Sequence, residues 1–342
     1  MSVVGPAVAD VLGVDGTYWD PLWRVRVELS ALERDLLRCW PVRRLGFVAH
    51  AGASAVATTQ SGSRLEHSLG VLALVAHVAP GDGLARAAAL LHDVGHLPLS
   101  HTLEGVAGLD HHTLGAARIR SLAELLGRHG VDTEDMVDVV DGRRASVLRS
   151  PRGVLKLDHL DGLVRSARAH GRTRQPPPET LARLRLVDGG VSADAATADL
   201  LVEMVAAEAR LHTAPVNVVA SAVVRHLVHG ALRDAAPARV QEVAEMTDDE
   251  LWALLLADPG TGRDARLLRR DPTAWRIAAP GDISDAGPDG QAATTAGFPF
   301  TISRLYLDLP LVDGRPTDPG HPALAGLPRM PWAGSVVPAQ PA

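Results

Sequence analysis

The sequence predicts a mainly α-helical protein with one short β-hairpin and a small C-terminal part that mixes helix and strand. Apolar residues make up 46% of the 342 residues but aromatic residues only 3%, so the core must consist largely of Ala, Leu and Val, which favours packed helices. Apolar side chains recur at helical spacing through most of the first 233 residues. Alternation typical of a strand is clear only from Phe298 to Val312.

The elements follow from local patterns along the chain. Residues 1–20 contain several Gly and Pro and are expected to be irregular, and residues 48–63, rich in Ala, Gly, Ser and Thr, are expected to form a loop. An Asp-Gly pair between two apolar runs predicts a hairpin over 184–191. Helices are expected over 28–39, 64–79, 84–93, 113–129, 134–141, 151–170, 193–211, 218–233 and 247–257.

These elements predict four parts of the chain. An irregular lead-in over 1–20 precedes a helical domain over 21–235, which is followed by a small α+β region over 236–315. A Gly/Pro/Asp-rich stretch interrupts that region at 279–297. The Pro-rich tail over 316–342 is expected to be poorly ordered.

Composition argues against several classes of function. The formal charge is −6 and Lys156 is the only lysine, so general nucleic-acid binding is not expected. The N-terminus has no basic segment followed by an apolar core, and no apolar run is long enough to span a membrane, so a cytoplasmic protein is expected. The single cysteine, Cys39, is interpreted as a small buried apolar residue rather than a reactive thiol.

Three segments concentrate residues whose side chains can bind a metal or take part in catalysis. They are Arg64-Leu-Glu-His-Ser-Leu-Gly70, Leu91-His-Asp-Val-Gly-His96 and Leu157-Asp-His-Leu-Asp161. The carboxylate of Asp93 at the end of an apolar helix would carry a large desolvation cost without a partner. A divalent cation is such a partner, and imidazole with carboxylate suits a first-row metal. His67 and Asp158 would complete a set of four ligands and leave positions open for water or substrate.

The alternative interpretation of His92 and Asp93 is a hydrogen-bonded ion pair that caps a helix. Against it stands an accumulation of histidines beside acidic residues, which scattered core histidines rarely show. Six histidines lie within 46 positions, namely His67, His92, His96, His101, His111 and His112.

Residues 64–115 resemble the HD superfamily of metal-dependent phosphohydrolases, whose pattern is His, then His-Asp, then a distant Asp. Within it, Arg-Leu-Glu-His-Ser-Leu-Gly-Val and Leu-Leu-His-Asp-Val-Gly-His-x-Pro-x-Ser-His are similar to the deoxynucleoside-triphosphate triphosphohydrolase branch, and the resemblance covers about residues 20–230. It implies an HD-domain helical bundle and a divalent metal ion (Zn, Mn, Fe, Mg, Ni or Co). It also implies the metal ligands His67, His92, Asp93 and Asp158.

The resemblance further implies residues around the substrate. His96, His101, Glu104 and His112 match residues that position the attacking water or protonate the leaving oxygen, although the family usually has Asp at Glu104. His112 is preferred over His111 because of its distance from Gly115. Three more positions match substrate contacts: Arg64 for phosphate, Asp161 for a sugar or for support of a ligand, and His212. Their alternatives are an ion pair of Arg64 with an acid such as Glu66, a helix-surface role for Asp161 and a structural role for His212.

Three positions depart from the triphosphohydrolase pattern. Gly162 and Val216 stand where the branch usually has Tyr, and Glu208 stands where it has Arg. These departures leave the metal site intact but weaken the case for a deoxynucleoside triphosphate. The expected function is hydrolysis of a phosphate ester or anhydride, with a nucleotide or another small phosphorylated molecule as substrate.

Three alternatives stay open for the function. The first is a phosphodiesterase, and the second is a di-iron oxygenase in which His96 and His112 supply further ligands. The third is a nucleotide sensor without catalysis. A homo-oligomer is possible, and the C-terminal strand region could serve its interface.

Overall fold

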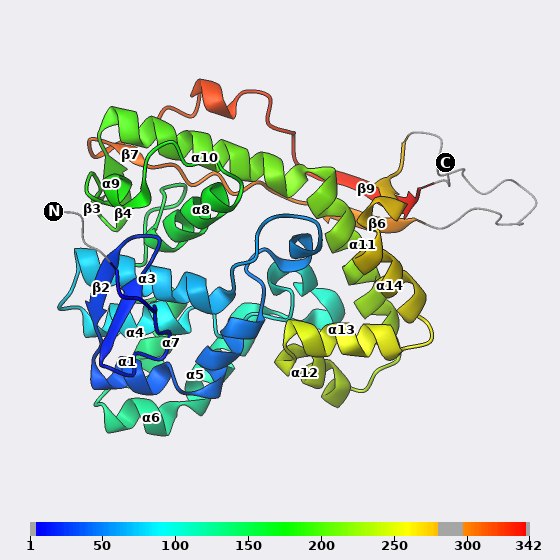
Figure 1. The fold of residues 1–342 in the computed structure, drawn as a ribbon, viewed down its shortest axis with the longest axis horizontal. Helices are drawn as coiled ribbons and strands as arrows, with labels where there is room; N and C mark the ends of the chain where they lie inside the picture. The colour runs from blue at the N-terminus through cyan, green and yellow to red at the C-terminus, as the bar shows by residue number, and fades with distance from the viewer. Residues whose placement is uncertain (1–4, 280–296, 340–342) are drawn as a thin grey trace, which may run out of the picture.

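The computed structural model describes residues 5–279 and 297–339 and confirms a mainly α fold (Figure 1). Helices from distant parts of the chain pack side by side, and short sheets lie at the periphery. The helices are α1 (Ala31–Leu36), α2 (Trp40–Arg43), α3 (Arg64–Val78), α4 (Gly83–Leu91), α5 (His111–Ser121), α6 (Ala123–Arg128), α7 (Thr133–Val140), α8 (Leu157–Ala169), α9 (Pro177–Leu181), α10 (Ala195–Thr213), α11 (Pro215–Ala231), α12 (Pro237–Glu245), α13 (Asp248–Ala257) and α14 (Gly262–Arg270).

Short 3-10 turns and strands complete the described chain. β1 pairs antiparallel with β2, β3-β4-β7-β8 form a mixed sheet, and β9 lies between β5 and β6 in an antiparallel sheet. The turns are η1 (Arg44–Phe47), η2 (Gly52–Val56), η3 (Ser100–Leu103), η4 (Val106–Gly108), η5 (Pro272–Ala274) and η6 (Pro322–Leu324). The strands are β1 (Thr17–Asp20), β2 (Val25–Glu28), β3 (Arg185–Val187), β4 (Gly190–Ala193), β5 (Trp275–Ile277), β6 (Phe298–Ile302), β7 (Leu311–Val312), β8 (Arg315–Pro316) and β9 (Trp332–Pro338).

The first hydrophobic core lies around α3, α4 and α8. Ser63 caps α3 by accepting a hydrogen bond from the backbone of Glu66, and Asp82 caps α4 in the same way through Ala85. Both helices are apolar on almost every side, so Leu72 and Leu90 are fully buried. This packing brings the start of α3, the end of α4 and the start of α8 to one place.

A second hydrophobic core joins the loop after α4 to the C-terminal helices. Leu97, Leu99 and Leu103 pack with side chains of α11, α13 and α14. Two buried arginines, Arg44 and Arg118, donate hydrogen bonds to backbone carbonyls of this loop and also to carbonyls at the end of α12. The C-terminal helices are therefore linked directly to the segment that contains His92, Asp93 and His96.

Several expected elements differ from those observed. The lead-in expected to be irregular ends in β1, which pairs with β2 beyond it, and Tyr18 and Asp20 of β1 are buried. The helix expected over 113–129 breaks at Leu122, whose ψ of 11° is not helical. The helices α12 and α14 were not expected, because few of their residues are apolar and buried.

The C-terminal strands also differ from expectation. The strand expected over 298–312 is limited to β6 and β7, and the loop between them crosses to the start of α8. The range expected to be a poorly ordered tail contains β9, the central strand of its sheet. The hairpin over 184–191 is present as β3 and β4, whereas nearly all of the stretch at 279–297 lies outside the described residues.

Two further expectations concern the surface and the thiol. Among the described residues, no helix combines the length and apolar character needed to cross a membrane. Cys39 is partly buried and packs against the first core, and burial raises the pKa of its thiol. A raised pKa disfavours the reactive thiolate.

Candidate metal centre

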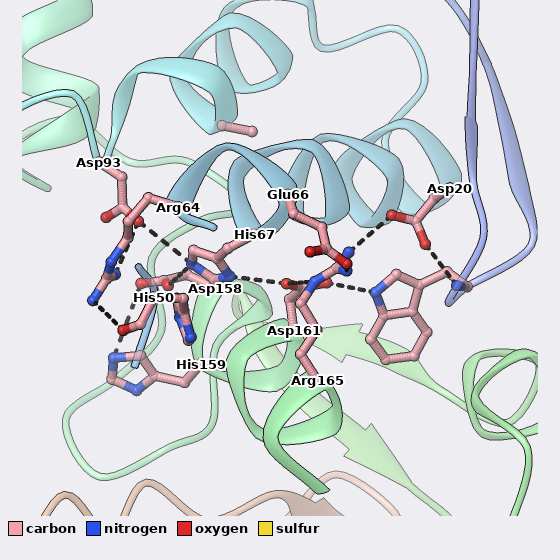
Figure 2. Close-up of polar contacts among 12 residues, drawn as sticks. Asp20, His50, Arg64, Glu66, His67, Asp93, Asp158, His159, Asp161 and Arg165 are labelled. Atoms are coloured by element: carbon pink, nitrogen blue, oxygen red, sulfur yellow. Dashed lines mark hydrogen bonds and ion pairs between the residues drawn. The ribbon is translucent and has the colours of Figure 1, made fainter. Parts of the chain in front are cut away.

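Three helix ends bring His67, His92 and Asp158 together (Figure 2). His67 lies in the first turn of α3, His92 caps the end of α4, and Asp158 lies in the first turn of α8. His67 Nε2 is 3.1 Å from Asp158 Oδ1 and 3.3 Å from His92 Nε2. Residues that are up to 91 positions apart in the sequence thus present their ligand atoms to one point.

Asp93 completes this group. Its Oδ1 is 3.5 Å from His92 Nε2 and its Oδ2 is 3.8 Å from His67 Nε2. In a tetrahedral site with metal–ligand bonds of about 2.1 Å, ligand atoms are separated by about 3.4 Å. The separations of 3.1–3.7 Å among His67, His92 and Asp158 fit one divalent cation, whereas Asp93 approaches the two imidazoles with different oxygen atoms.

The protonation of the two imidazoles supports the same conclusion. His67 Nδ1 is 2.8 Å from Asp161 Oδ2, and His92 Nδ1 is 2.8 Å from the carbonyl of Ala89. Since both acceptors require a proton on Nδ1, the neutral rings present bare Nε2 atoms to each other at 3.3 Å. Two facing lone pairs repel unless a cation or a proton lies between them, and two imidazoles with two carboxylates suit a first-row divalent metal.

Asp161 supports His67 from behind. Its side chain is fully buried, and it accepts hydrogen bonds from Trp23 Nε1 at 2.7 Å and from Arg165 Nε at 2.6 Å in addition to its contact with His67. Arg165 also pairs with the buried carboxylate of Asp20. With both oxygens engaged inside the protein, Asp161 has the supporting role rather than the alternative role of contacting a sugar.

Charges around the centre shift its pKa values strongly. Burial opposes protonation of His67, but the hydrogen bonds with Asp158 and Asp161 outweigh it and raise the pKa of His67 to about 9. Burial also opposes ionisation of Asp158, but Lys156 and the imidazoles hold its pKa well below the usual value. The carboxylate is therefore ionised and the metal-free His67 is protonated near pH 7, as expected for a site that exchanges a proton for a metal ion.

Arg64 is part of this centre but is largely occupied. Its side chain is buried, and it donates from Nη1 to Asp93 Oδ2 at 3.0 Å, from Nε to Ser100 at 2.9 Å and from Nη2 to the carbonyl of His50 at 3.3 Å. The ion pair expected as the alternative for Arg64 forms with Asp93 rather than with Glu66, which pairs with Arg165, and it is buried rather than on the surface. Arg64 braces a predicted metal ligand, and its contact with substrate phosphate stays a prediction.

Sequence reasoning did not single out the partners of Asp158. Lys156, the only lysine, lies 2.6 Å from Asp158 Oδ2. His159 packs beside it and pairs with Asp308 at 2.7 Å. Asp308 lies in the loop between β6 and β7, 150 positions after Asp158. No pattern in the sequence indicates that Asp308 would reach the metal centre. The C-terminal region thus reaches the metal centre.

A second cluster of imidazoles adjoins the metal centre. The rings of His96, His101 and His111 have centroids 4.6–5.0 Å apart, and their ligand atoms lie within 4.8 Å of one another. His96 Nε2 is 3.1 Å from Asp93 Oδ1, so Asp93 lies between the two groups. Burial and the charge of Arg64 lower the pKa of His96 to about 3, which leaves this ring neutral. We refer to His96, His101 and His111 as the histidine cluster.

A close approach of two glycines brings His111 to the histidine cluster. A side chain at Gly95 would place its Cβ 2.0 Å from the carbonyl oxygen of His111 and 2.5 Å from the nitrogen of Gly115. Only glycine at position 95 therefore allows α5 to pack against the turn after α4. In this position His111 contacts Glu104, with 2.7 Å between His111 Nδ1 and Glu104 Oε2.

The structure places the other expected site residues differently. His112 is exposed, and its ring contacts only that of His111, with centroids 4.0 Å apart and a tilt of 35°, so among the described residues His111 rather than His112 joins His96 and His101. His101 belongs to the cluster but is exposed, and Glu104 contacts His111. His212 lies at the end of α10, 3.5 Å from Glu208, and its carbonyl accepts a hydrogen bond from Asn217. This position agrees with the structural alternative for His212.

Residues 64–181 match the family described as HD domain, and this range includes all four predicted metal ligands.

The chain is also similar to curated proteins and to a solved structure. The chain is 28% identical over 150 residues to the uncharacterized protein YdhJ of Bacillus subtilis, with 42% of this chain and 45% of the relative covered. It is 30% identical over 147 residues to the metal-dependent phosphohydrolase cns2 of Cordyceps militaris, with 40% and 41% covered. A phosphohydrolase from Bacteroides thetaiotaomicron superposes with a TM-score of 0.61 at 17% identity over 77% of this chain and 78% of that chain. The chain spans less than half the length of the curated relatives that it matches, and the structural likeness shows the fold alone.

Proposed function

We propose that the protein hydrolyses a phosphate ester or anhydride with the help of a divalent metal ion, and that its substrate is a nucleotide or a similar small phosphorylated molecule. The observation that carries this proposal is the convergence of His67, His92, Asp93 and Asp158 beside the histidine cluster. The names of two similar proteins support this proposal: the relative from Cordyceps militaris is a metal-dependent phosphohydrolase, and the structural neighbour from Bacteroides thetaiotaomicron is a phosphohydrolase.

The metal centre and the histidine cluster have different roles in the proposed reaction. A bound divalent ion lowers the pKa of a coordinated water from about 15.7 toward about 7 and polarises a phosphoryl oxygen. The protein holds the four predicted ligands in place through Asp161, Ala89, Lys156 and Arg64. Ionised carboxylates and bare imidazole nitrogens are the forms that bind a cation.

The histidine cluster supplies proton transfer. Glu104 contacts His111 Nδ1 and stabilises a proton there, so that His111 Nε2 can carry a proton to the leaving oxygen. His96 is neutral and faces Asp93, which keeps the cluster close to the reacting phosphate. This arrangement provides a general acid on one side of a centre that activates water on the other.

One observation favours a second candidate. The ligand atoms of His96, His101 and His111 lie within 4.8 Å of one another, close enough to hold a second metal ion. A two-metal centre would serve a phosphodiesterase or a di-iron oxygenase. Metal stoichiometry separates these cases, because the favoured proposal requires one metal ion per chain and the alternative requires two.

The decisive experiment combines metal analysis with phosphate release. Wild-type protein loaded with Mn, Zn, Fe, Co, Ni or Mg is assayed against a panel of nucleoside mono- and triphosphates, phosphodiesters and simple phosphate esters. We expect phosphate release with one metal ion per chain and, for His92→Ala, loss of the metal and a fall in kcat/KM of about a thousandfold or more. His92 is suitable because its side chain makes few contacts that the fold requires.

The control is His77→Ala, which removes an exposed imidazole from the far end of α3, the helix that also carries His67. This variant should retain both metal and activity. Phosphate release that persists in metal-free protein, or no release by the metal-loaded wild type from any member of the panel, would contradict the proposal. Oxygen consumption by the iron form would support the oxygenase instead.

A further inference from the structure

The carboxylate of Asp248 lies on a C-terminal helix but contacts two distant segments of the chain. Asp248 is the first residue of α13 and is partly buried. Its Oδ2 accepts a hydrogen bond from the backbone nitrogen of Ala49 at 2.8 Å, and its Oδ1 accepts one from the backbone nitrogen of Leu99 at 2.6 Å. The two donors precede it by 199 and 149 positions. One carboxylate thus joins the loop over 48–63 to the turn that follows α4.

Helix α13 does not need the carboxylate of Asp248 in order to begin. Its N-cap is Thr247, whose hydroxyl accepts from the backbone nitrogen of Glu250, while Glu250 accepts from the backbone nitrogen of Thr247. Asp249 supplies another acidic side chain in the same first turn, where a negative charge is favourable, and it is exposed. The contacts with the two distant backbone nitrogens are therefore the feature that distinguishes Asp248.

The contact with Leu99 holds an unfavourable backbone conformation. Leu99 and Ser100 both have a φ of 54°, in the left-handed region that residues other than glycine rarely adopt. Such residues persist only where the surrounding structure fixes them. Asp248 accepts from the nitrogen of Leu99, and the nitrogen of Ser100 donates to the carbonyl of Leu97 at 2.9 Å. The next residue is His101 of the histidine cluster, so the position of its ring depends on this turn.

Arg64 holds the following residue of each segment. Its Nη2 donates to the carbonyl of His50, the residue after Ala49. Its Nε donates to the hydroxyl of Ser100, the residue after Leu99. The hydroxyl of Ser100 in turn donates to the carbonyl of Ala49 at 2.5 Å. The two segments are therefore held by Arg64 at the metal centre and, one residue earlier in each, by the carboxylate on α13.

The two segments also pack too closely to move independently. A Cβ at Gly52 would lie 2.7 Å from the carbonyl oxygen of Leu99 and 2.6 Å from Oγ1 of Thr102. The backbone nitrogen of Ala53 donates to the same Oγ1 at 2.9 Å. The loop and η3 thus form one unit, and Asp248 links this unit to the C-terminal helices.

We propose that Asp248 is a positioning residue for the proposed hydrolysis: its carboxylate holds the turn at Leu99 and so fixes the ring of His101 beside the reacting phosphate. This inference rests on the proposed function, because it requires His101 to act on a phosphate at the metal centre. It assigns no contact with substrate or metal to Asp248. Helix α13 contributes to catalysis through the backbone of a segment that it contacts.

The main test replaces Asp248 by Asn in the metal-loaded protein. The amide retains the size of the side chain but has a single acceptor oxygen, so it does not reproduce the two hydrogen bonds from backbone nitrogens. A displacement of about 1 Å at a catalytic group can lower the rate about a hundredfold, so we expect kcat to fall about tenfold to a hundredfold. The substrate is the one that the wild type hydrolyses best. The metal content should not change, and KM should change less than about threefold.

Two variants in the same helical turn serve as controls. Asp249→Asn makes the same change of charge at an adjacent, exposed residue and should keep kcat within about twofold of the wild type. Thr247→Ala removes the cap of α13 and should lower the unfolding temperature, but kcat below that temperature should stay within about twofold. A purely structural role for Asp248 predicts that Asp248→Asn behaves like Thr247→Ala.

A double mutant identifies the residue through which Asp248 acts. In a His101→Ala background, Asp248→Asn should lower kcat by less than about threefold, because the ring that it positions is already absent. Nuclear magnetic resonance of Zn²⁺-loaded protein with labelled imidazoles gives a second readout that needs no substrate. The resonance of His101, assigned by its loss in His101→Ala, should shift in Asp248→Asn and not in Asp249→Asn.

Asp248→Glu retains two carboxylate oxygens but displaces them by one methylene, so it should lower kcat less than Asp248→Asn does. If the Asn variant does not fold, a folded Glu variant decides the question, and a fall in kcat of about threefold or more with full metal content supports the inference. Wild-type kcat in a folded variant at position 248, an equal effect of Asp248→Asn with and without His101, or an unchanged His101 resonance overturns it and leaves the hydrolase proposal intact. A wild type that releases no phosphate removes the proposed function, whereas the His101 resonance still tests the contact with Asp248.

Discussion

The metal centre and the histidine cluster share Asp93 but are built in different ways. In the metal centre, the ligands lie on helix ends of the first core, and His67, His92 and Asp158 each have a protein partner behind them. The histidine cluster lies on the turn after α4, on the first residue of α5 and on η3, which begins with positive φ at both Leu99 and Ser100. Binding a metal demands fixed ligands, whereas proton transfer to a substrate requires rings that can reach it.

The supports of the two groups come from different cores. Helices α3, α4 and α8 of the first core position the metal ligands. The loop of the histidine cluster packs on the second core, where Arg225 of α11 donates to the carbonyls of Thr102 and Glu104 at 2.8 Å each. The C-terminal helices therefore shape the acid–base half of the site, and changes there should alter turnover without removing the metal.

The largest effect that separates the two groups is expected for His111→Ala. Loss of a general acid typically costs two to four powers of ten, so we expect kcat to fall about a hundredfold or more. The metal content should not change, since His111 lies outside the metal centre. The measurement is steady-state kinetics together with metal analysis of the purified variant.

His112→Ala is the matched control for His111→Ala. It removes the adjacent, exposed imidazole and should change kcat less than threefold, because a surface substitution away from the site has little effect. If His112→Ala were the defective variant and His111→Ala were active, the assignment from the sequence would be restored and the observed cluster would not be the catalytic one.

This pair shows where sequence reasoning succeeds and fails. The convergence of His67, His92, Asp93 and Asp158 could be predicted because the His, His-Asp, Asp pattern is specific, whereas their role as metal ligands stays a prediction. The choice between His111 and His112 could not, since it depends on the close packing of Gly95 against Gly115, which turns the first residue of α5 inward. Spacing along the chain carries no information on that rotation.

The supporting residues show a second limit. Trp23 and Asp308 reach the centre from opposite ends of the chain, and neither stands in a recognisable pattern. The helical part of the fold follows from apolar periodicity, but a short strand such as β9 depends on pairing with distant segments. Pairing between segments that are distant in the chain is the feature that is hardest to predict from a single sequence.

A smaller effect, confined to the metal centre, is expected for Asp161→Asn. The amide retains the size of the side chain but cannot match the carboxylate that accepts from Trp23, His67 and Arg165. Loss of such a support typically weakens metal binding about 10- to 100-fold. Isothermal titration with Mn²⁺ or Zn²⁺ measures this change, and turnover at saturating metal should recover more fully than in His111→Ala.

Stability needs a separate check in Asp161→Asn, because removing one buried carboxylate leaves Arg165 less well compensated. Breaking a buried pair costs about 3–5 kcal/mol, although Arg165 retains Asp20 and Glu66 as partners. Thermal unfolding of metal-free protein separates this loss from the loss of metal affinity. Equal metal affinity in the wild type and a folded Asp161→Asn would show that His67 needs no support from behind.

The last difference between the two groups is a dependence of metal affinity on pH that the histidine cluster does not share. Metal-free His67 has a pKa of about 9, and binding a cation at Nε2 must displace its proton. The apparent dissociation constant should therefore fall by about tenfold per pH unit as pH rises from 6 toward 9, and then level off. Titrations in buffers of different ionisation enthalpy should show release of at least one proton at pH 7.

The raised pKa of His67 also stabilises the metal-free fold below about pH 6.5, and this contribution is lost as pH rises through about 9. Since Asp161 helps to raise this pKa, Asp161→Asn should move the levelling point to lower pH, whereas His111→Ala should leave it unchanged; an identical profile in all three proteins would contradict the assignment of the proton to His67.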